Sequence, residues 1–170
     1  MKRFARRAVI AAALVAVPAF AATPAFAATT AGTATKPAAG TVAAYEAEVV
    51  KLTNAQRTAK GCPALRIDSR LGTAARAHSS DMVAASFFSH TGSDGSNFVT
   101  REMRAGYPKG GPSAENIAWG YRTPKDVVTA WMNSSGHRKN ILNCSSVAVG
   151  VGLAYTAGGA PYWTQDFGRS

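Results

Sequence analysis

Apolar and polar residues follow a helical period in the first half of the chain. Over residues 43–60 the large apolar side chains fall on one helical face. The pattern ends at Gly61, and Pro63 follows two residues later. A second helix, capped by Asp68 or Ser69, is expected to continue to about Ser86. Its apolar face is rich in alanine, which predicts close packing against another element.

Two shorter segments and a clear helix start come next. Residues 97–105 have the pattern of a short helix, and residues 115–120 have that of a short strand. Thr123 is a capping residue, and Pro124 suits the first position of a helix. A helix is therefore expected from this point, and residues 134–136 interrupt its pattern.

The end of the chain has the two-residue period of β-strands. Valine and leucine alternate with smaller residues over 147–153, and an aromatic-rich partner strand is expected over 162–167. The glycines of residues 156–160 favour a hairpin turn between them. Helices first and strands last predict an α+β fold, and about 130 residues are enough for one core.

The first 42 residues lack the features of a packed domain. Residues 1–27 combine a basic start, an apolar run and small residues at a cleavage site, which is typical of a secretory signal peptide. Residues 28–42 are expected to be a flexible linker. The folded domain is therefore placed at 43–170. We predict a secreted protein without a transmembrane segment after signal removal, with a retained N-terminal anchor as the alternative.

The charge of the chain is basic but dispersed. Nineteen basic and nine acidic residues give +10, and removal of the four basic residues within 1–27 leaves about +6. No long run of Lys or Arg follows, which argues against a nucleic-acid partner. Weak attraction to an acidic cell wall or an anionic membrane surface fits this charge. We expect a monomer.

Cys62 and Cys144 are the two cysteines of the chain. An exported protein meets an oxidising environment, so we expect a single disulfide between them. The bond would join the end of the first helix to the loop before the last strands. Residues 54–57 of the first helix are expected to hold neighbouring loops in place.

Three residues are candidates for chemistry: His90, Glu115 and His137. Both histidines follow helices in Gly- and Ser-rich segments, where a side chain can face a cleft. Glu115 begins an otherwise apolar strand, where a buried carboxylate needs a partner. Two histidines and one glutamate are also a familiar zinc ligand set with one position left for water. Their spacing is not a metal motif. His78, within an apolar helical face, is expected to be a packed core residue.

Five segments together resemble the CAP superfamily, also called SCP-like, which includes cysteine-rich secretory proteins, antigen 5 and plant pathogenesis-related proteins. The segments are FFSHTGSDG, AENIAWG, WMNSSGHRKNIL, VGVG and YWTQDFG. Their order and spacing look like the short bacterial branch, and they cover about residues 44–168. The resemblance implies an α-β-α sandwich with a central antiparallel sheet between helical layers.

The resemblance also implies a cleft lined by two histidines and two acids, of which half is present. His90 and Glu115 match one histidine and one acid of this set. Ser134 stands where the second acid usually lies, and Tyr162 stands where the second histidine usually lies. His137 belongs to a stretch typical of the bacterial branch, and we expect it to bring an imidazole to the same cleft.

Two functions use these residues directly. The first is metal binding, in which His90 and His137 hold Zn²⁺ or another divalent ion and Glu115 is a ligand or orients one. The alternative is hydrolysis of cell-wall or other extracellular substrates, with the same three residues as catalytic candidates; the resemblance implies proteolysis at most in some members. Candidate nucleophiles are metal-activated water, Ser89, Ser134 and Ser135.

Two further candidate functions involve neither a metal ion nor a catalysed reaction. The third is binding of a small ligand, a lipid or a cell-wall component, and the resemblance implies lipid or sterol binding in some members. The aromatic residues considered for such a groove, or else for core packing, are Tyr107, Trp119, Tyr121 and Tyr162. The fourth is a structural or surface-interaction role. We expect binding outside the cell rather than catalysis.

Overall fold

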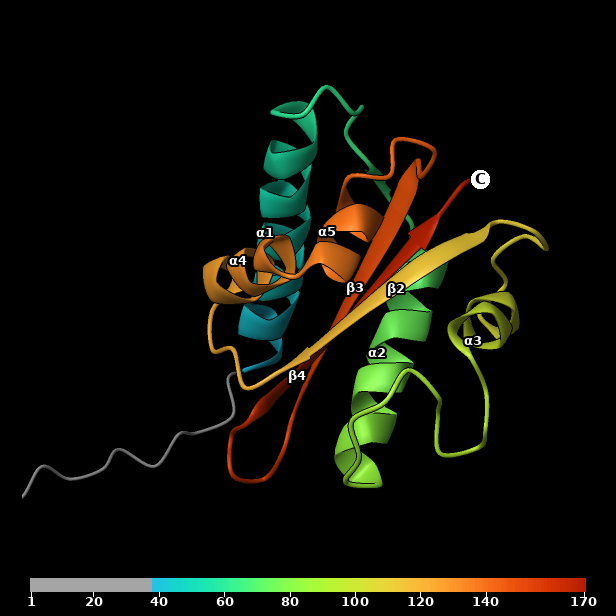
Figure 1. Cartoon of the computed structure of the whole chain (residues 1–170). Helices are drawn as coiled ribbons and strands as arrows, with labels where there is room; N and C mark the ends of the chain where they lie inside the picture. The colour runs from blue at the N-terminus through green and yellow to red at the C-terminus, as the bar shows by residue number, and fades with distance from the viewer. Residues whose placement is uncertain (1–37) are drawn as a thin grey trace, which may run out of the picture. The chain divides into compact units, whose positions relative to one another are not determined.

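The computed structural model describes residues 38–170, so the predicted signal peptide and residues 28–37 of the predicted linker lie outside the described residues. Within this range, no helix is both long enough and apolar enough to cross a bilayer. The elements, shown in Figure 1, are α1 (Ala39–Thr58), β1 (Arg66–Ile67), α2 (Ser69–Ala84), α3 (Phe98–Arg104), β2 (Pro112–Trp119), α4 (Pro124–Asn133), α5 (Ser135–Ile141), β3 (Ala148–Tyr155) and β4 (Pro161–Gly168). Because α1 begins at Ala39, it includes the end of the segment predicted as linker.

Three helices begin where a side chain accepts a hydrogen bond from the first helical turn. The capping residues are Asp68 for α2, Asn97 for α3 and Thr123 for α4. At α4 the cap is followed by Pro124, which has no N–H to leave unpaired. The helix starts predicted from the sequence are therefore confirmed.

The predicted interruption after α4 is shorter than the sequence indicated. Only Ser134 has extended backbone, with φ −94° and ψ 123°, and α5 begins at the next residue. His137 therefore lies inside a short helix and not in an open segment. A single extended residue changes the direction of the chain, because it stops one hydrogen-bond ladder and caps the next.

The four strands form one sheet in the order β1-β3-β4-β2. Strand β4 pairs antiparallel with both β3 and β2, whereas the two-residue β1 pairs parallel with β3. The sheet is thus antiparallel, as predicted, except at this short edge. Strand β2 is the other edge. Alternation along β2 places Glu115 and Trp119 on one face and Asn116 on the opposite face.

Helices cover both faces of the sheet and form the expected α-β-α sandwich (Figure 1). Helix α2 packs against β3, where a Cβ at Gly152 would lie only 2.2 Å from the backbone nitrogen of Arg76. Because glycine has no side chain, the backbone of α2 can pack directly against β3 at this position. Helices α1, α4 and α5 cover the other face, and the largest side chains of that core are Trp131, Trp163 and Phe167.

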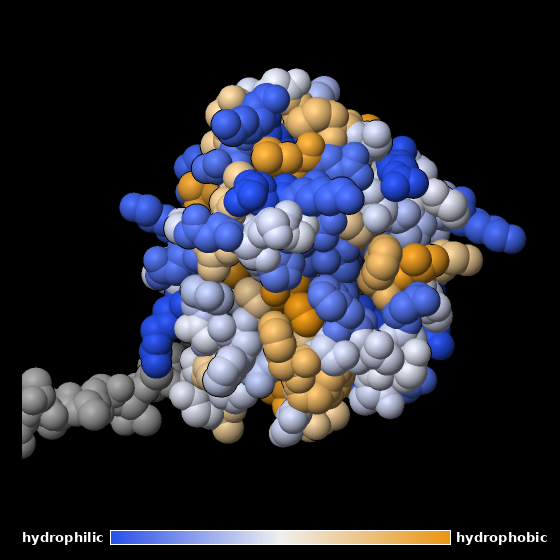
Figure 2. Space-filling model, in the orientation of Figure 1, coloured by the Kyte–Doolittle hydropathy of each residue, from blue (hydrophilic) through white to orange (hydrophobic). Residues whose placement is uncertain are grey.

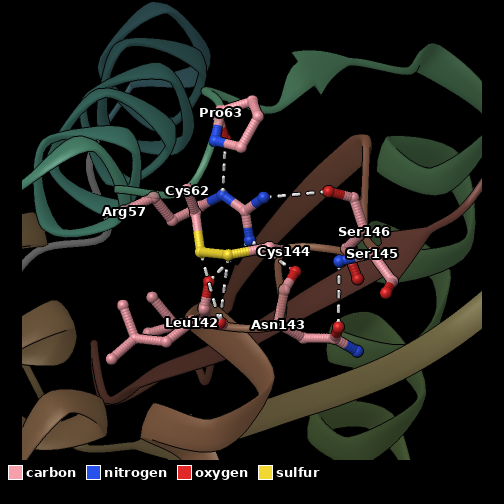
Figure 3. Close-up of a disulfide and its surroundings, with 9 residues drawn as sticks. Arg57, Cys62, Pro63, Leu142, Asn143, Cys144, Ser145 and Ser146 are labelled. Carbon is pink, nitrogen blue, oxygen red and sulfur yellow. Dashed lines mark hydrogen bonds between the residues drawn. A yellow bond between two sulfur atoms is a disulfide. The ribbon is translucent and has the colours of Figure 1, made fainter. Parts of the chain in front are cut away.

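Cys62 and Cys144 form the predicted disulfide, shown in Figure 3. Beside it, Arg57 is fully buried, and its guanidinium donates four hydrogen bonds of 2.8–3.0 Å. The acceptors are the backbone carbonyls of Pro63, Ile141, Asn143 and Ser146. Asn54 bonds both backbone groups of Leu65. Residues of the predicted 54–57 segment thus hold loops in place, and they connect the end of α1 to the end of α5.

Candidate functional site

Glu115 is the centre of a polar network on the edge strand. Its side chain is 1% exposed, and His90 Nδ1 lies 2.7 Å from its Oε1. Arg101 donates from Nη2 to Oε2 at 2.6 Å. Both carboxylate oxygens are therefore engaged, which offsets the free energy of burying the charge. Of the two histidines predicted to meet Glu115, His90 does so directly, and Arg101 is a partner that sequence reasoning missed.

Arg101 also holds the segment that carries His90. Its guanidinium donates to the backbone carbonyl of Ser96 at 2.7 Å and to that of His90 at 3.1 Å. The His90 side chain is 55% exposed. With Nδ1 fixed by the carboxylate, the ring is oriented by a buried group and presents its other nitrogen to solvent.

His137 approaches β2 from the opposite helical layer. Asn116, the neighbour of Glu115, donates from its side chain to the His137 carbonyl at 3.3 Å. Asn140 donates to Asn116 Oδ1 at 2.9 Å and thereby ties α5 to the strand. Burial, and to a lesser extent the neighbouring charge of His90, lowers the pKa of His137. The ring is therefore neutral at neutral pH, which is the form that binds metal ions.

Two more carboxyl groups lie buried close to Glu115. They are Glu102 of α3 and Asp166, which pairs with Glu115 across β2 and β4. Their oxygen atoms have no hydrogen-bond partner within residues 38–170. Burial, followed by the charge of Glu115, raises the pKa of Glu102 to about 8 and raises the pKa of Asp166 well above its usual range. The raised pKa values favour the protonated, uncharged form of both groups.

These two acids were not predicted as members of the site. Asp166 carries the signal that identified Glu115, namely an acid within an apolar strand, whereas Glu102 lies in a polar helical stretch that gives no such signal. His78 is confirmed as a core residue with no exposed surface. Its Nε2 lies 2.9 Å from the Ser89 carbonyl oxygen and 3.9 Å from Glu115 Oε2.

The serines near the histidines do not form a nucleophile–base pair. Within the described part of the chain, no serine hydroxyl is hydrogen-bonded to a histidine ring. The hydroxyl of Ser89 instead accepts from the backbone N–H of Thr91 at 3.0 Å. Ser134 connects α4 to α5, and its side chain makes no capping hydrogen bond. The serine form of the hydrolase hypothesis therefore has no geometric support.

The four aromatic residues considered for a groove separate into two groups. Tyr107 is 2% exposed, and its hydroxyl donates to the Ser170 carbonyl at 2.6 Å, so it is a core residue. Trp119 and Tyr121 are exposed, and Tyr162 is half-buried beside Trp119. Surface aromatics thus remain at the end of β2, on the loop that follows it and at the start of β4.

A metal ion requires a donor set, and residues 38–170 contain no group of three or more His, Cys, Asp or Glu side chains arranged to hold one. The oxygens of Glu115 are occupied by His90 and Arg101. Among these residues the donors left for a cation would be the imidazoles of His90 and His137, which lie close enough for the charge of His90 to help lower the pKa of His137. Glu115 fits the orienting role rather than that of a ligand.

Known proteins match most of the domain. Residues 50–167 match the model of the cysteine-rich secretory protein family, CAP. The uncharacterized protein YkwD of Bacillus subtilis (strain 168) is 46% identical over 132 residues, which are 76% of this chain and 49% of YkwD. The chain therefore spans about half the length of this relative.

Two solved structures share the fold. An extracellular protein containing a SCP domain from Bacillus anthracis str. Ames has a TM-score of 0.70 and 27% identity, over 80% of this chain and 45% of that protein. An outer surface protein of Borrelia burgdorferi has a TM-score of 0.65 and 21% identity, over 71% of this chain and 89% of that one. The likeness supports the sandwich architecture described above.

Proposed function

The chain belongs to the cysteine-rich secretory protein family, CAP, and from this premise we propose that it is an extracellular binding module whose two imidazoles, His90 and His137, hold a divalent transition-metal ion such as Zn²⁺. The location outside the cell is supported by the signal-like pattern of residues 1–27 and by the extracellular SCP-domain protein of similar fold. We propose binding and assign no reaction.

The observation that carries this proposal is the 2.7 Å contact between His90 Nδ1 and Glu115 Oε1. A carboxylate on one ring nitrogen fixes the tautomer and orientation of the imidazole, and it raises the basicity of the other nitrogen. Histidines that bind metals usually have such a partner. Arg101 holds the second oxygen of Glu115 at 2.6 Å, so the carboxylate cannot turn away from the ring.

The second imidazole is suited to the same ion because it is neutral. The lowered pKa of His137 favours the uncharged ring at neutral pH, in which one nitrogen keeps a lone pair for a cation. Two protein ligands leave further positions for water or for donor groups of a bound partner. We therefore expect weaker binding than at a closed, four-ligand zinc site.

Calorimetric titration of zinc into the protein at neutral pH tests the proposal. We expect one binding event. His90→Ala and His137→Ala should each weaken it by about tenfold or more, and Glu115→Gln should have a smaller effect because its amide oxygen still accepts from Nδ1–H. Affinity should fall as the pH drops through about 6, because protons compete for the imidazoles.

Thr91→Ala, a change at the exposed neighbour of His90, is the matched control and should bind zinc like the wild type. Unchanged binding by the His90→Ala, His137→Ala double variant would show the proposal to be wrong. A loss of thermal stability in His90→Ala, without any change in zinc affinity, would instead assign the network a structural role.

A further inference from the structure

A pocket of about 420 Å³ lies between α2 and α3, two helices that pack against each other (Figure 1). Its walls include Ala74 and Ala77 of α2 and Ala105, which follows the last residue of α3. Its lining also includes two buried polar residues, His78 and Arg101. A cavity of this size with apolar walls and a few polar groups has the character of a small-molecule site.

His78 brings an unpaired hydrogen-bond acceptor to the pocket. Its side chain has no exposed surface, and its Nε2 lies 2.9 Å from the carbonyl oxygen of Ser89. Burial lowers the pKa of His78, which favours the neutral ring. A carbonyl oxygen can only accept, so Nε2 carries the single ring hydrogen and Nδ1 keeps a lone pair. No donor among residues 38–170 reaches Nδ1.

Arg101 brings an unpaired donor to the same pocket. Its Nη1 donates to the Ser96 carbonyl, and its Nη2 donates to Glu115 Oε2. Its Nε is also buried, and within the described part of the chain its N–H has no acceptor. A buried donor and a buried acceptor without partners both cost free energy. A ligand that accepts from Arg101 and donates to His78 would remove both costs.

The charged side chains around the pocket balance one another. Asp81 and Asp94 contribute two negative charges, and Arg101 and Arg104 contribute two positive charges. The Asp81 carboxylate already accepts from the backbone and the hydroxyl of Ser93, and Asp94 is paired with Arg104. These carboxylates hold the loop between the helices in place. The balance of charge favours a neutral ligand over an ion.

We propose that this pocket binds a small neutral molecule with a carboxamide group on a short apolar body. The amide oxygen accepts from Nε–H of Arg101, and the amide N–H donates to Nδ1 of His78. The apolar body packs against the alanine side chains of the walls.

Other head groups satisfy only one of the two unpaired atoms. A carboxylate has no hydrogen for Nδ1 of His78, and an ammonium group has no acceptor for Nε–H of Arg101. A broad protein partner would need an extended apolar patch. On the face shown in Figure 2 the surface is mostly hydrophilic, and hydrophobic residues form scattered patches. The amide site contains neither His90 nor His137, so it is separate from the proposed metal site.

Nitrogen NMR of the histidine rings tests the inference. The probes are acetamide and hexanamide, added at neutral pH to the protein in EDTA. We expect the resonance of His78 Nδ1 to shift as its lone pair accepts a hydrogen bond. Affinity should be in the millimolar range and should be higher for hexanamide, because its chain covers more of the apolar wall. N,N-dimethylhexanamide and hexanoate have no N–H to donate and should leave the resonance unchanged.

Two matched variants locate the site. Ala77→Leu fills the pocket from an exposed position on its wall and should weaken hexanamide binding by about tenfold or more. Ala55→Leu makes the same change at an exposed position of α1 and should bind like the wild type. Circular dichroism checks that both variants are folded. Because EDTA removes free metal ions, these results do not depend on the zinc titration.

Four outcomes would overturn the inference. One is a free protein in which the ring hydrogen of His78 is on Nδ1. Another is an unchanged His78 resonance with hexanamide at the limit of its solubility. The third is an equal response to N,N-dimethylhexanamide, which would show that donation to Nδ1 is not part of the binding. The fourth is equal hexanamide affinity in Ala77→Leu and the wild type.

Discussion

Glu102 shows how one buried residue makes stability depend on pH. Its pKa is raised to about 8 from a usual value of 4.5. Its contribution to stability is therefore complete below about pH 4.5 and is lost as the pH rises toward 8. We expect the free energy of unfolding to decrease between about pH 6.5 and 8, by up to about 1.4 kcal/mol per pH unit for each such group. Glu102→Gln should reduce this slope in urea denaturation.

Measurement between about pH 6.5 and 8 separates the effect of the buried carboxyl groups from that of the histidines. The lowered pKa values of His78 and His137 make stability rise with pH, but only up to their unfolded value of 6.5. Asp166 has a raised pKa and adds to the expected decrease. Glu48→Gln, at a partly exposed ion pair with Lys51, is the control and should keep the wild-type slope. Equal slopes for Glu102→Gln and the wild type would contradict the prediction.

The contact between α2 and β3 depends on glycines, which is a prediction at the scale of elements. A Cβ at Gly152 would lie 2.2 Å from the backbone nitrogen of Arg76 and 2.3 Å from the carbonyl carbon of Ala75. Because these are backbone atoms of a helix, Gly152→Ala must displace α2. We expect a loss of about 1–3 kcal/mol in the free energy of unfolding. Gly158→Ala, with its nearest atom at 3.9 Å, should stay within about 0.5 kcal/mol. Urea denaturation of both variants decides the point, and equal stabilities would refute it.

Elements with local signals were predictable from the sequence, and elements defined by distant partners were not. Capping residues predicted the starts of α2 and α4, the residue pattern predicted α3, and alternation with a period of two predicted β3 and β4. Strand β1 has two residues and exists through its pairing with β3. In the site, an acid in an apolar strand identified Glu115 and its need for a partner. Arg101 reaches it from another element, which no local pattern reveals.

At the scale of the whole molecule, the disulfide and Arg57 join the same parts of the chain (Figure 3). The cysteines are 82 residues apart, so the Cys62→Ser, Cys144→Ser double variant should lose at most about 4–5 kcal/mol of unfolding free energy. Urea denaturation measures this loss. We expect the folded variant to keep the zinc affinity of the wild type, because the bond acts mainly by restricting the unfolded chain.

Arg57 explains why loss of the disulfide should lower the free energy of unfolding without changing the geometry of the proposed zinc site. Its hydrogen bonds to the carbonyls of Ile141 and Ser146 do not depend on the disulfide. Ile141 is the last residue of α5, the helix that carries His137, so the guanidinium holds the end of that helix whether or not the disulfide is present. Four carbonyls share this one buried donor, and their pairing is strong because the donor is charged. Weaker zinc binding by the double cysteine variant would mean that the disulfide, rather than Arg57, sets the position of α5.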